Sequence, residues 1–280
     1  MIEAALSRQT STFGGGDFTA RLRKALVDLL SGLRLWRLWT MLGWTDIRQR
    51  YRRALIGPFW LTISMGAMVG GMGLVYGTLF QQDLTVFLPY VAAGFLGWQL
   101  ISSSIGDGAT PFILAEGLIK QGGLPLSLHV FRTVWRNFLI FLHNSVVMLV
   151  IYILIHKFDP ISLVLVIPGL ALNLLNLTWM LLLIGPLCTR FRDFSPIIAN
   201  VMQLMFFITP IVFHPAALMK IGWIVYCNPW YYMVEAIRDP LLGQGLPLDI
   251  VVPLTLEAII GWIAAILFFA RVRGRIAFWI

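Results

Sequence analysis

The residues of this chain that could carry out chemistry are few and far apart. The four histidines and two cysteines show no metal-ligand spacing and no CxxC pair; they are His129, His143, His156, His214, Cys188 and Cys227. The chain has no phosphate loop of the form GxxxxGKS or GxxxxGKT, and not even a Gly-Lys pair. We therefore expect no catalytic site, no metal and no cofactor bound by this chain.

Two charged features could still act on a ligand. Arg50, Arg52 and Arg53 form a basic cluster directly before an apolar stretch, and guanidinium groups bind phosphate oxygens well. A plain positive anchor on the cytoplasmic side of a membrane explains the cluster equally well. Glu257 is an isolated carboxylate inside an apolar stretch, where such a group usually has a partner or faces water. The sequence does not identify that partner.

Long apolar stretches must position these residues. Hydrophobic residues make up 59% of the chain and charged residues 12%, about half the charged fraction of a soluble domain. A hydrocarbon core of about 30 Å needs about 20 helical residues. The sequence predicts an all-α membrane protein with six spans, at about residues 58–80, 86–106, 131–155, 161–187, 197–213 and 251–270.

The basic residues predict the orientation of these spans. With the N-terminus in the cytoplasm, Lys157, Lys220 and Arg238 are the only ones of the 21 Lys and Arg residues that fall on the outer side. This distribution follows the positive-inside rule, so both termini are expected in the cytoplasm. The same asymmetry accounts for the net charge of +8, and we expect no nucleic-acid binding.

The part before the first span is expected to lie at the membrane surface. One helical face carries Leu35, Leu38, Trp39 and Leu42 with arginines beside it, which is typical of an amphipathic helix in the membrane interface. A solvated helix that only precedes the first span is the alternative. The chain thus divides into a flexible Gly-rich leader, an interface-helix region and a transmembrane domain, at residues 1–18, 19–53 and 54–280.

Two connections are unusual. The connection after the second span holds a short amphipathic segment, Pro111–Lys120, which predicts a small helix that docks on a partner, with an ordinary polar turn as the alternative. Residues 214–249 are too interrupted for a span and too apolar for a simple loop, so they predict short re-entrant helices. Aromatic rings of this region are expected at the outer headgroup boundary: Trp223, Tyr226, Trp230 and Tyr231. Glu235 and Arg238 are expected to pair.

Glycines recur along the first span. Gly66, Gly70, Gly73 and Gly77 form one stripe that would let another helix approach closely. That helix could belong to the same chain or to a second copy, and chance enrichment of glycine in membrane helices is the alternative.

Three sequence blocks resemble the ABC-2 type permeases that export bacterial polysaccharides, which include Wzm-type O-antigen, KpsM-type capsule and TagG-like teichoic-acid permeases. The blocks are RYRRALIGPFW (Arg50–Trp60), RFRDFSPIIANVMQLMFFITPIVFHP (Arg190–Pro215) and NPWYYMVEAIRDPLLGQG (Asn228–Gly245). They occur in the family's order, and the resemblance extends from about Leu35 to the end. Ala54 departs from the small hydroxyl residue of many members.

The resemblance implies a half-transporter in the bacterial inner membrane. Two copies of the chain would form a channel for polysaccharide, above all O-antigen, linked to an undecaprenyl-pyrophosphate carrier in the lipid bilayer. Two copies of a cytoplasmic ABC ATPase would hold ATP and Mg. Teichoic acid, small lipids and drugs are the alternative cargoes, because one fold serves several functions.

The resemblance also implies roles for particular residues. The ATPase contact would comprise Pro111, Phe112, Ile113, Leu114, Glu116 and Lys120. The basic cluster at Arg50, Arg52 and Arg53 would hold the carrier pyrophosphate, and the outer gate would comprise Trp223, Tyr226, Trp230 and Tyr231. Aromatic residues within spans could stack on sugar rings or simply pack helices and face lipid: Tyr76, Trp98, Trp179, Phe206 and Phe207.

Two other function classes fit the sequence less well. A secondary transporter would show paired intramembrane charges and an internal repeat, whereas Glu257 is the single charge well inside a predicted span. A membrane enzyme would show clustered carboxylates or histidines, and Glu235 with Asp239 is the nearest approach to such a cluster.

Overall fold

The computed structural model describes residues 18–52, 57, 59–155, 160–215 and 222–280, and all its regular elements are helices. The predicted leader, Arg53, Ala54, His156, Lys157 and Lys220 lie outside these residues, except that Phe18 of the leader is described and begins α2. The helices are α2 (Phe18–Arg34), α3 (Trp36–Arg50), α4 (Phe59–Leu79), α5 (Leu84–Asp107), α6 (Pro111–Leu114), α7 (Glu116–Gln121), α8 (Ser127–Ile155), α9 (Pro160–Arg190), α10 (Phe194–Ile208), α11 (Trp223–Tyr226), α12 (Pro229–Leu241) and α13 (Leu248–Trp279).

The all-α prediction is confirmed, and five of the described helices are long and apolar enough to cross a membrane: α4, α5, α8, α9 and α13. The predicted span at 197–213 corresponds to α10, which is apolar but only 15 residues long. It ends at Ile208 because Thr209 adopts an extended conformation before Pro210, and a residue that precedes proline is disfavoured in a helix. Residues 209–213 therefore continue without helical structure.

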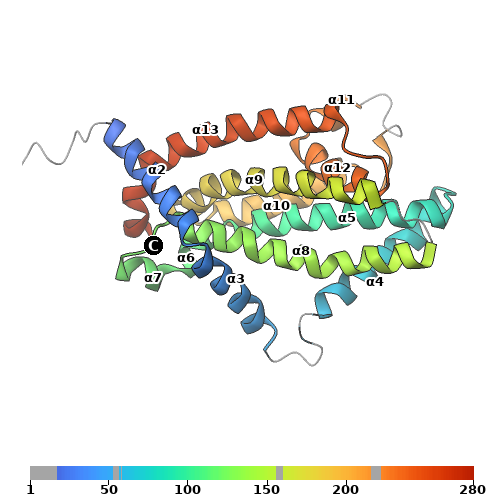
Figure 1. Ribbon diagram of the computed structural model, residues 1–280, viewed down its shortest axis with the longest axis horizontal. Helices are drawn as coiled ribbons and strands as arrows, with labels where there is room; N and C mark the ends of the chain where they lie inside the picture. Colours follow the sequence, from blue (N-terminus) through green and yellow to red (C-terminus); the bar gives the residue numbers. More distant parts are fainter. Residues whose placement is uncertain (1–17, 53–56, 58, 156–159, 216–221) are drawn as a thin grey trace, which may run out of the picture.

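The long helices lie side by side in an elongated bundle (Figure 1). Helix α13 packs along α9, and α5 packs against α8 and α12. Helices α2, α6 and α7 lie at one end together with the C-terminus, and we call this the α6 end. Helix α11 and the beginning of α5 lie at the opposite end, called here the α11 end.

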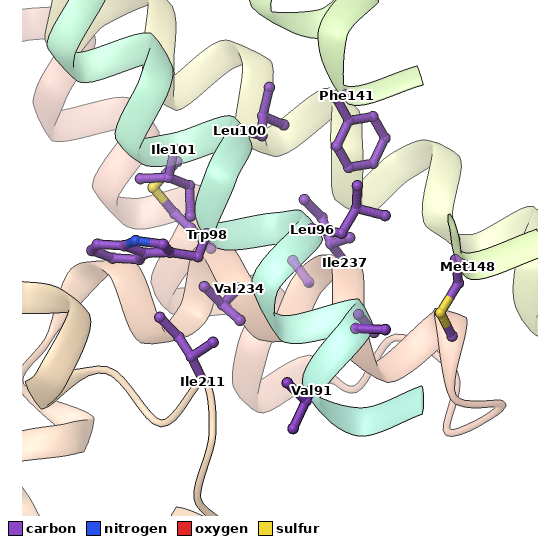
Figure 2. Close-up of a cluster of buried hydrophobic side chains, with 14 of the residues drawn as sticks. Val91, Leu96, Trp98, Leu100, Ile101, Phe141, Met148, Ile211, Val234 and Ile237 are labelled. Carbon is purple, nitrogen blue, oxygen red and sulfur yellow. The ribbon is translucent and has the colours of Figure 1, made fainter. Parts of the chain in front are cut away.

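Helix α5 is the centre of the larger hydrophobic cluster. Figure 2 shows Trp98 and Leu96 of α5 beside Val234 and Ile237 of α12. Small residues allow this close approach, since a Cβ atom at Gly97 would already touch the Val234 backbone at 3.6 Å. Buried apolar surface and close packing hold α12 against the long helices.

The glycine stripe of α4 is used only partly within the chain. Gly73 and Gly77 are buried against Leu88 and Leu84 of α5, whereas nothing lies within 4 Å of a Cβ atom placed at Gly70. Most other side chains of α4 are exposed. Gly73 and Gly77 therefore pack directly against α5, whereas Gly66 and Gly70 line a shallow apolar cleft that α4 forms with α5 and α8.

The predicted interface region consists of two helices, α2 and α3, which meet at Leu35. Part of the face expected to reach lipid instead packs on α8. The centroid of the Trp39 ring lies 6.2 Å from that of Phe131 and 5.8 Å from that of Trp135. Gly43 and Ile47 extend this buried seam, because Gly43 allows Trp135 to approach closely. The apolar residues of α3 that remain exposed are Trp36, Met41 and Trp44.

Candidate functional site: the α6 end and the α12 hairpin

The segment predicted to dock on a partner forms two short helices, α6 and α7, separated at Ala115. Phe112 is completely buried, and its ring would lie 2.8 Å from a Cβ atom at Gly185 of α9. Leu114 is 74% exposed. The segment is therefore anchored to the bundle by one aromatic side chain and presents a neighbouring apolar side chain outward.

The predicted charges of this segment lie on α7. The Lys120 Nζ atom lies 2.6 Å from Oε1 of Glu116, and both side chains are half exposed. The hydrogen bond from Lys120, together with its charge, lowers the pKa of the Glu116 carboxyl below its ordinary value. Exposed pairs of this kind contribute little to stability. Because both side chains are half exposed, a partner protein could contact either of them. Pro111 is buried and Ile113 is half-buried.

Arg136 of α8 connects two helices near the α6 end. Its Nη2 atom donates to Oδ2 of Asp107 at 2.7 Å, and its Nη1 atom donates to Oδ2 of Asp46 on α3 at 3.3 Å. Arg132 donates to both carboxylate oxygens of Asp46, and Asn137 donates to Asp107. This network ties α3 and α8 to the last residue of α5, four residues before α6 begins.

This network is not among the contacts that the sequence predicts. Arg132 and Arg136 counted only as positive charges on the cytoplasmic side. Their spacing of four residues on a helix was a usable signal, since residues four apart lie on one face. The acidic partners, Asp46 and Asp107, are distant in sequence and carried no comparable signal.

Arg50 and Arg52 are exposed at and just after the end of α3, before α4 begins. Arg53, the third member of the predicted cluster, lies outside the described residues. The role proposed for this cluster therefore depends on its position and charge, and not on any contact.

The predicted re-entrant region, residues 214–249, contains α11 and α12, and its residues 216–221 lie outside the described part. Asn228 joins the two helices: its Oδ1 atom accepts from the Trp230 backbone N–H at 3.0 Å, and its Nδ2 donates to Thr209 Oγ1 at 2.8 Å. The first of these bonds makes Asn228 the N-cap of α12. Trp223 and Tyr226 are exposed, while Trp230 and Tyr231 are half-buried, and the rings of Tyr226 and Tyr231 are 5.7 Å apart.

The predicted pair of Glu235 and Arg238 is confirmed, and it is almost entirely buried. Arg238 Nε donates to Glu235 Oε2 at 2.9 Å, and Nη1 donates to the Pro210 carbonyl oxygen at 2.6 Å. The guanidinium carbon also lies 4.1 Å from the ring centroid of Tyr90. The Tyr90 hydroxyl donates to the Phe213 carbonyl at 2.9 Å. Arg238 therefore fastens α12 to α5 and to the segment that follows α10.

The five predicted channel aromatics do not form one group. Trp98 is buried and packs edge-on against the Phe206 ring, with the ring centroids 5.9 Å apart. The ring centroids of Phe206 and Phe207 are 5.5 Å apart. Phe207 is 67% exposed, so these three rings run from the core to the surface of α10. Tyr76 stacks on Phe80 with the ring centroids 5.9 Å apart, and Trp179 packs against Gly261 of α13. Neither Tyr76 nor Trp179 belongs to this group of three rings.

Glu257 of α13 lines an apolar cleft of about 330 Å³. Trp179, Trp230 and Met202 are among the residues that line this cleft. Among the described residues, no Lys or Arg forms an ion pair with Glu257. Glu257 thus lines the same cleft as Trp179, a predicted channel residue, and Trp230, a predicted outer-gate residue.

The helices from α3 to the end of α12 match the family model described as ABC-2 type transporter, over residues 37–242. The chain belongs to this family. An ABC-2 chain is the transmembrane permease subunit, and a separate subunit hydrolyses ATP.

Three relatives carry the name O-antigen export system permease protein RfbA. Two are from Klebsiella pneumoniae, 24% and 23% identical over 239 residues, which is 83% of this chain and 90% of each relative. The third is from Myxococcus xanthus and is 24% identical over 169 residues, 60% of this chain and 65% of the relative. The resemblance to polysaccharide-exporting ABC-2 permeases is therefore confirmed at the level of the family.

Proposed function

We propose that this chain is the permease subunit of an ATP-driven exporter that moves lipid-linked polysaccharide, above all O-antigen, across the bacterial inner membrane. The cargo assignment rests on the relatives, which are named for O-antigen export and align over most of this chain. Teichoic acid, small lipids and drugs are the alternative cargoes. Two copies of the chain would form the channel and two ATPase subunits would drive it.

One structural observation carries the coupling part of this proposal: Phe112 anchors α6 in the bundle while Leu114 beside it is exposed. An exposed apolar side chain on a small, firmly seated helix suits a contact that transmits movement from a partner. We assign this contact to the ATPase. Glu116 and Lys120 of α7 would contribute charged contacts at its edge.

With six crossings both termini would lie on the same side of the membrane, and the positive-inside rule would make that side the cytoplasm. The 15 residues of α10 extend about 22 Å at 1.5 Å per residue, which is less than a hydrocarbon core of about 30 Å. Residues 209–213, which follow α10 without helical structure, would supply the remaining length. Helix α10 and this segment together would form the crossing that α10 alone is too short to complete, and the α6 end would face the cytoplasm.

The channel and its two ends follow from this orientation. Arg50, Arg52 and Arg53 would hold the pyrophosphate of the lipid carrier at the cytoplasmic entrance. The exposed ring of Phe207 would stack on sugar within the channel, with Trp98 and Phe206 behind it as support. Helices α11 and α12 would close the outer exit through Trp223, Tyr226, Trp230 and Tyr231.

The test is deletion of the gene in its host followed by measurement of surface polysaccharide, intracellular lipid-linked glycan and drug susceptibility. We expect surface polysaccharide to be lost and lipid-linked glycan to accumulate inside the cell, with reversal by the intact gene. Unchanged surface polysaccharide together with altered drug susceptibility would refute the cargo assignment and favour small molecules.

A further inference from the structure

Helix α2 crosses α13 near the C-terminal end of α13, at the α6 end (Figure 1). Residues of both helices line a strongly basic cavity there. Its volume is about 320 Å³. Five of its seven lining residues are basic and none is acidic: Arg21, Lys24, Ala270, Arg271, Arg273, Gly274 and Arg275. The charges therefore surround a hollow instead of being spread over a convex surface.

An ion pair between distant parts of the chain builds this cavity. Asp28 of α2 is buried, and its Oδ2 atom accepts from Nε of Arg273 on α13 at 2.6 Å. The same carboxylate accepts from the backbone N–H groups of Leu126 and Ser127. Asp28 thus holds α2 against both α13 and the beginning of α8, and the two walls of the cavity are fixed relative to each other.

The pair with Asp28 neutralises only one of the five basic side chains. Among the described residues, no carboxylate forms an ion pair with Arg21, Lys24, Arg271 or Arg275. Like charges gathered in a hollow repel each other. A bound anion with several oxygen atoms would remove this repulsion, and phosphate is the group that clustered Arg and Lys side chains bind well.

An apolar strip of α2 begins beside the cavity. Val27, Leu30 and Leu33 are each at least half exposed, and Val27 lies one helical turn from Lys24. The opposite face of α2 is buried against α8 and α13. A ligand with a phosphate group and hydrocarbon chains would meet both the basic cavity and this strip.

We propose that the cavity binds the phosphate of an anionic lipid headgroup, with the lipid chains lying along the exposed strip of α2. The site would hold α2 and the end of α13 at the membrane surface. It is separate from the basic cluster at Arg50 and Arg52, which lies at the end of α3. The inference does not depend on the cargo, so a different cargo would leave it standing.

Protection of Lys24 in the unmodified protein tests the site first. The protein in neutral detergent would be treated with an amine-acetylating reagent, and the acetylation of Lys24 and Lys120 would be measured by mass spectrometry. We expect phosphatidylglycerol or phosphatidic acid to slow acetylation of Lys24 at least about fivefold and to leave Lys120 unchanged; about fivefold is the effect of one basic contact with an anionic surface. Phosphatidylcholine, whose headgroup carries no net charge, is the matched lipid control.

A soluble anion separates the two possible sources of phosphate. Protection of Lys24 by the anionic lipids but not by inorganic pyrophosphate would support the lipid assignment. Equal protection by pyrophosphate would overturn that assignment in favour of a soluble ligand. If neither the anionic lipids nor pyrophosphate changed the acetylation of Lys24, the site itself would be overturned.

Two variants with the same loss of charge provide the second test. The cavity variant is Arg21→Gln with Lys24→Gln and Arg275→Gln, and it keeps the pair between Asp28 and Arg273. The control variant is Arg23→Gln with Arg34→Gln and Arg37→Gln, which removes three exposed charges of α2 and α3 that do not line the cavity. Retained phosphatidylglycerol would be counted after purification by native mass spectrometry.

We expect the cavity variant to bind phosphatidylglycerol about fivefold more weakly for each charge removed, and the control variant to bind it as the wild type does. Equal binding by both variants would overturn the proposal. If the cavity variant does not fold, the acetylation experiment decides the matter, because it uses the wild-type protein.

Discussion

Arg136 of α8 and Asp107 at the end of α5 form an ion pair of 2.7 Å, four residues before α6 begins. The same guanidinium group reaches Asp46 on α3 at 3.3 Å. A single side chain thus connects the helix before the first span to the helix that leads into the proposed ATPase contact. Movement of α6 and movement of α3 are expected to be linked through it.

Arg136→Gln is expected to lower the stability of the protein by about 1–3 kcal/mol, because two partly buried carboxylates lose a charged donor. The control is Arg132→Gln, which leaves the bond between Arg136 and Asp107 intact. Thermal unfolding in detergent compares the two. In the complex with the ATPase, Arg136→Gln should also reduce transport per ATP hydrolysed more than the control does. An equal effect of both variants on this ratio would contradict a specific linking role.

Leu114→Asp is expected to weaken ATPase binding without a change in thermal stability, because Leu114 is exposed. Phe112→Ala is the contrasting change: it removes a fully buried ring and should cost about 3–5 kcal/mol of stability. Co-purification with the ATPase and thermal unfolding are the two measurements. Undiminished co-purification and full coupling of Leu114→Asp would argue against α6 as the contact.

Arg238→Met is expected to destabilise the protein by about 3–5 kcal/mol, because it leaves the buried Glu235 carboxylate without its partner. The double variant with Glu235→Gln should recover part of this loss, since the unpaired charge is then removed. Thermal unfolding of both single variants, the double variant and the wild type forms a double-mutant cycle. Additive effects in this cycle would show that the pair does not act as a unit.

The triple change Arg50→Gln, Arg52→Gln and Arg53→Gln is expected to impair loading of lipid-linked glycan more than membrane insertion. Three guanidinium groups that would hold the carrier pyrophosphate are lost, while many other basic residues still orient the chain. Export and membrane insertion would be compared with those of the variant changed at Arg23, Arg34 and Arg37. Normal export by a correctly inserted triple variant would refute the entrance role.

The long apolar helices could be predicted from the sequence because their cause is local. A stretch of about 20 apolar residues forms a helix in lipid whatever lies beside it, since each backbone N–H must find a partner within the helix. The pair of Glu235 and Arg238 was predictable for the same reason, being three residues apart on one helix. The end of α10 at Ile208, by contrast, depends on Pro210 and on contacts that Pro210 and Phe213 make with Arg238 and Tyr90.

By itself, the sequence determined that this chain is an all-helical ABC-2 permease with long apolar helices, because helix formation and family motifs are written in neighbouring residues. Only the tertiary structure decided which charges meet, namely Asp28 with Arg273 and Asp46 with Arg136. It also decided that Glu257 lies in an apolar cleft. Asp28 and Arg273 are 245 residues apart. No local pattern specifies such a pair, since their contact results from the packing of α2 against α13.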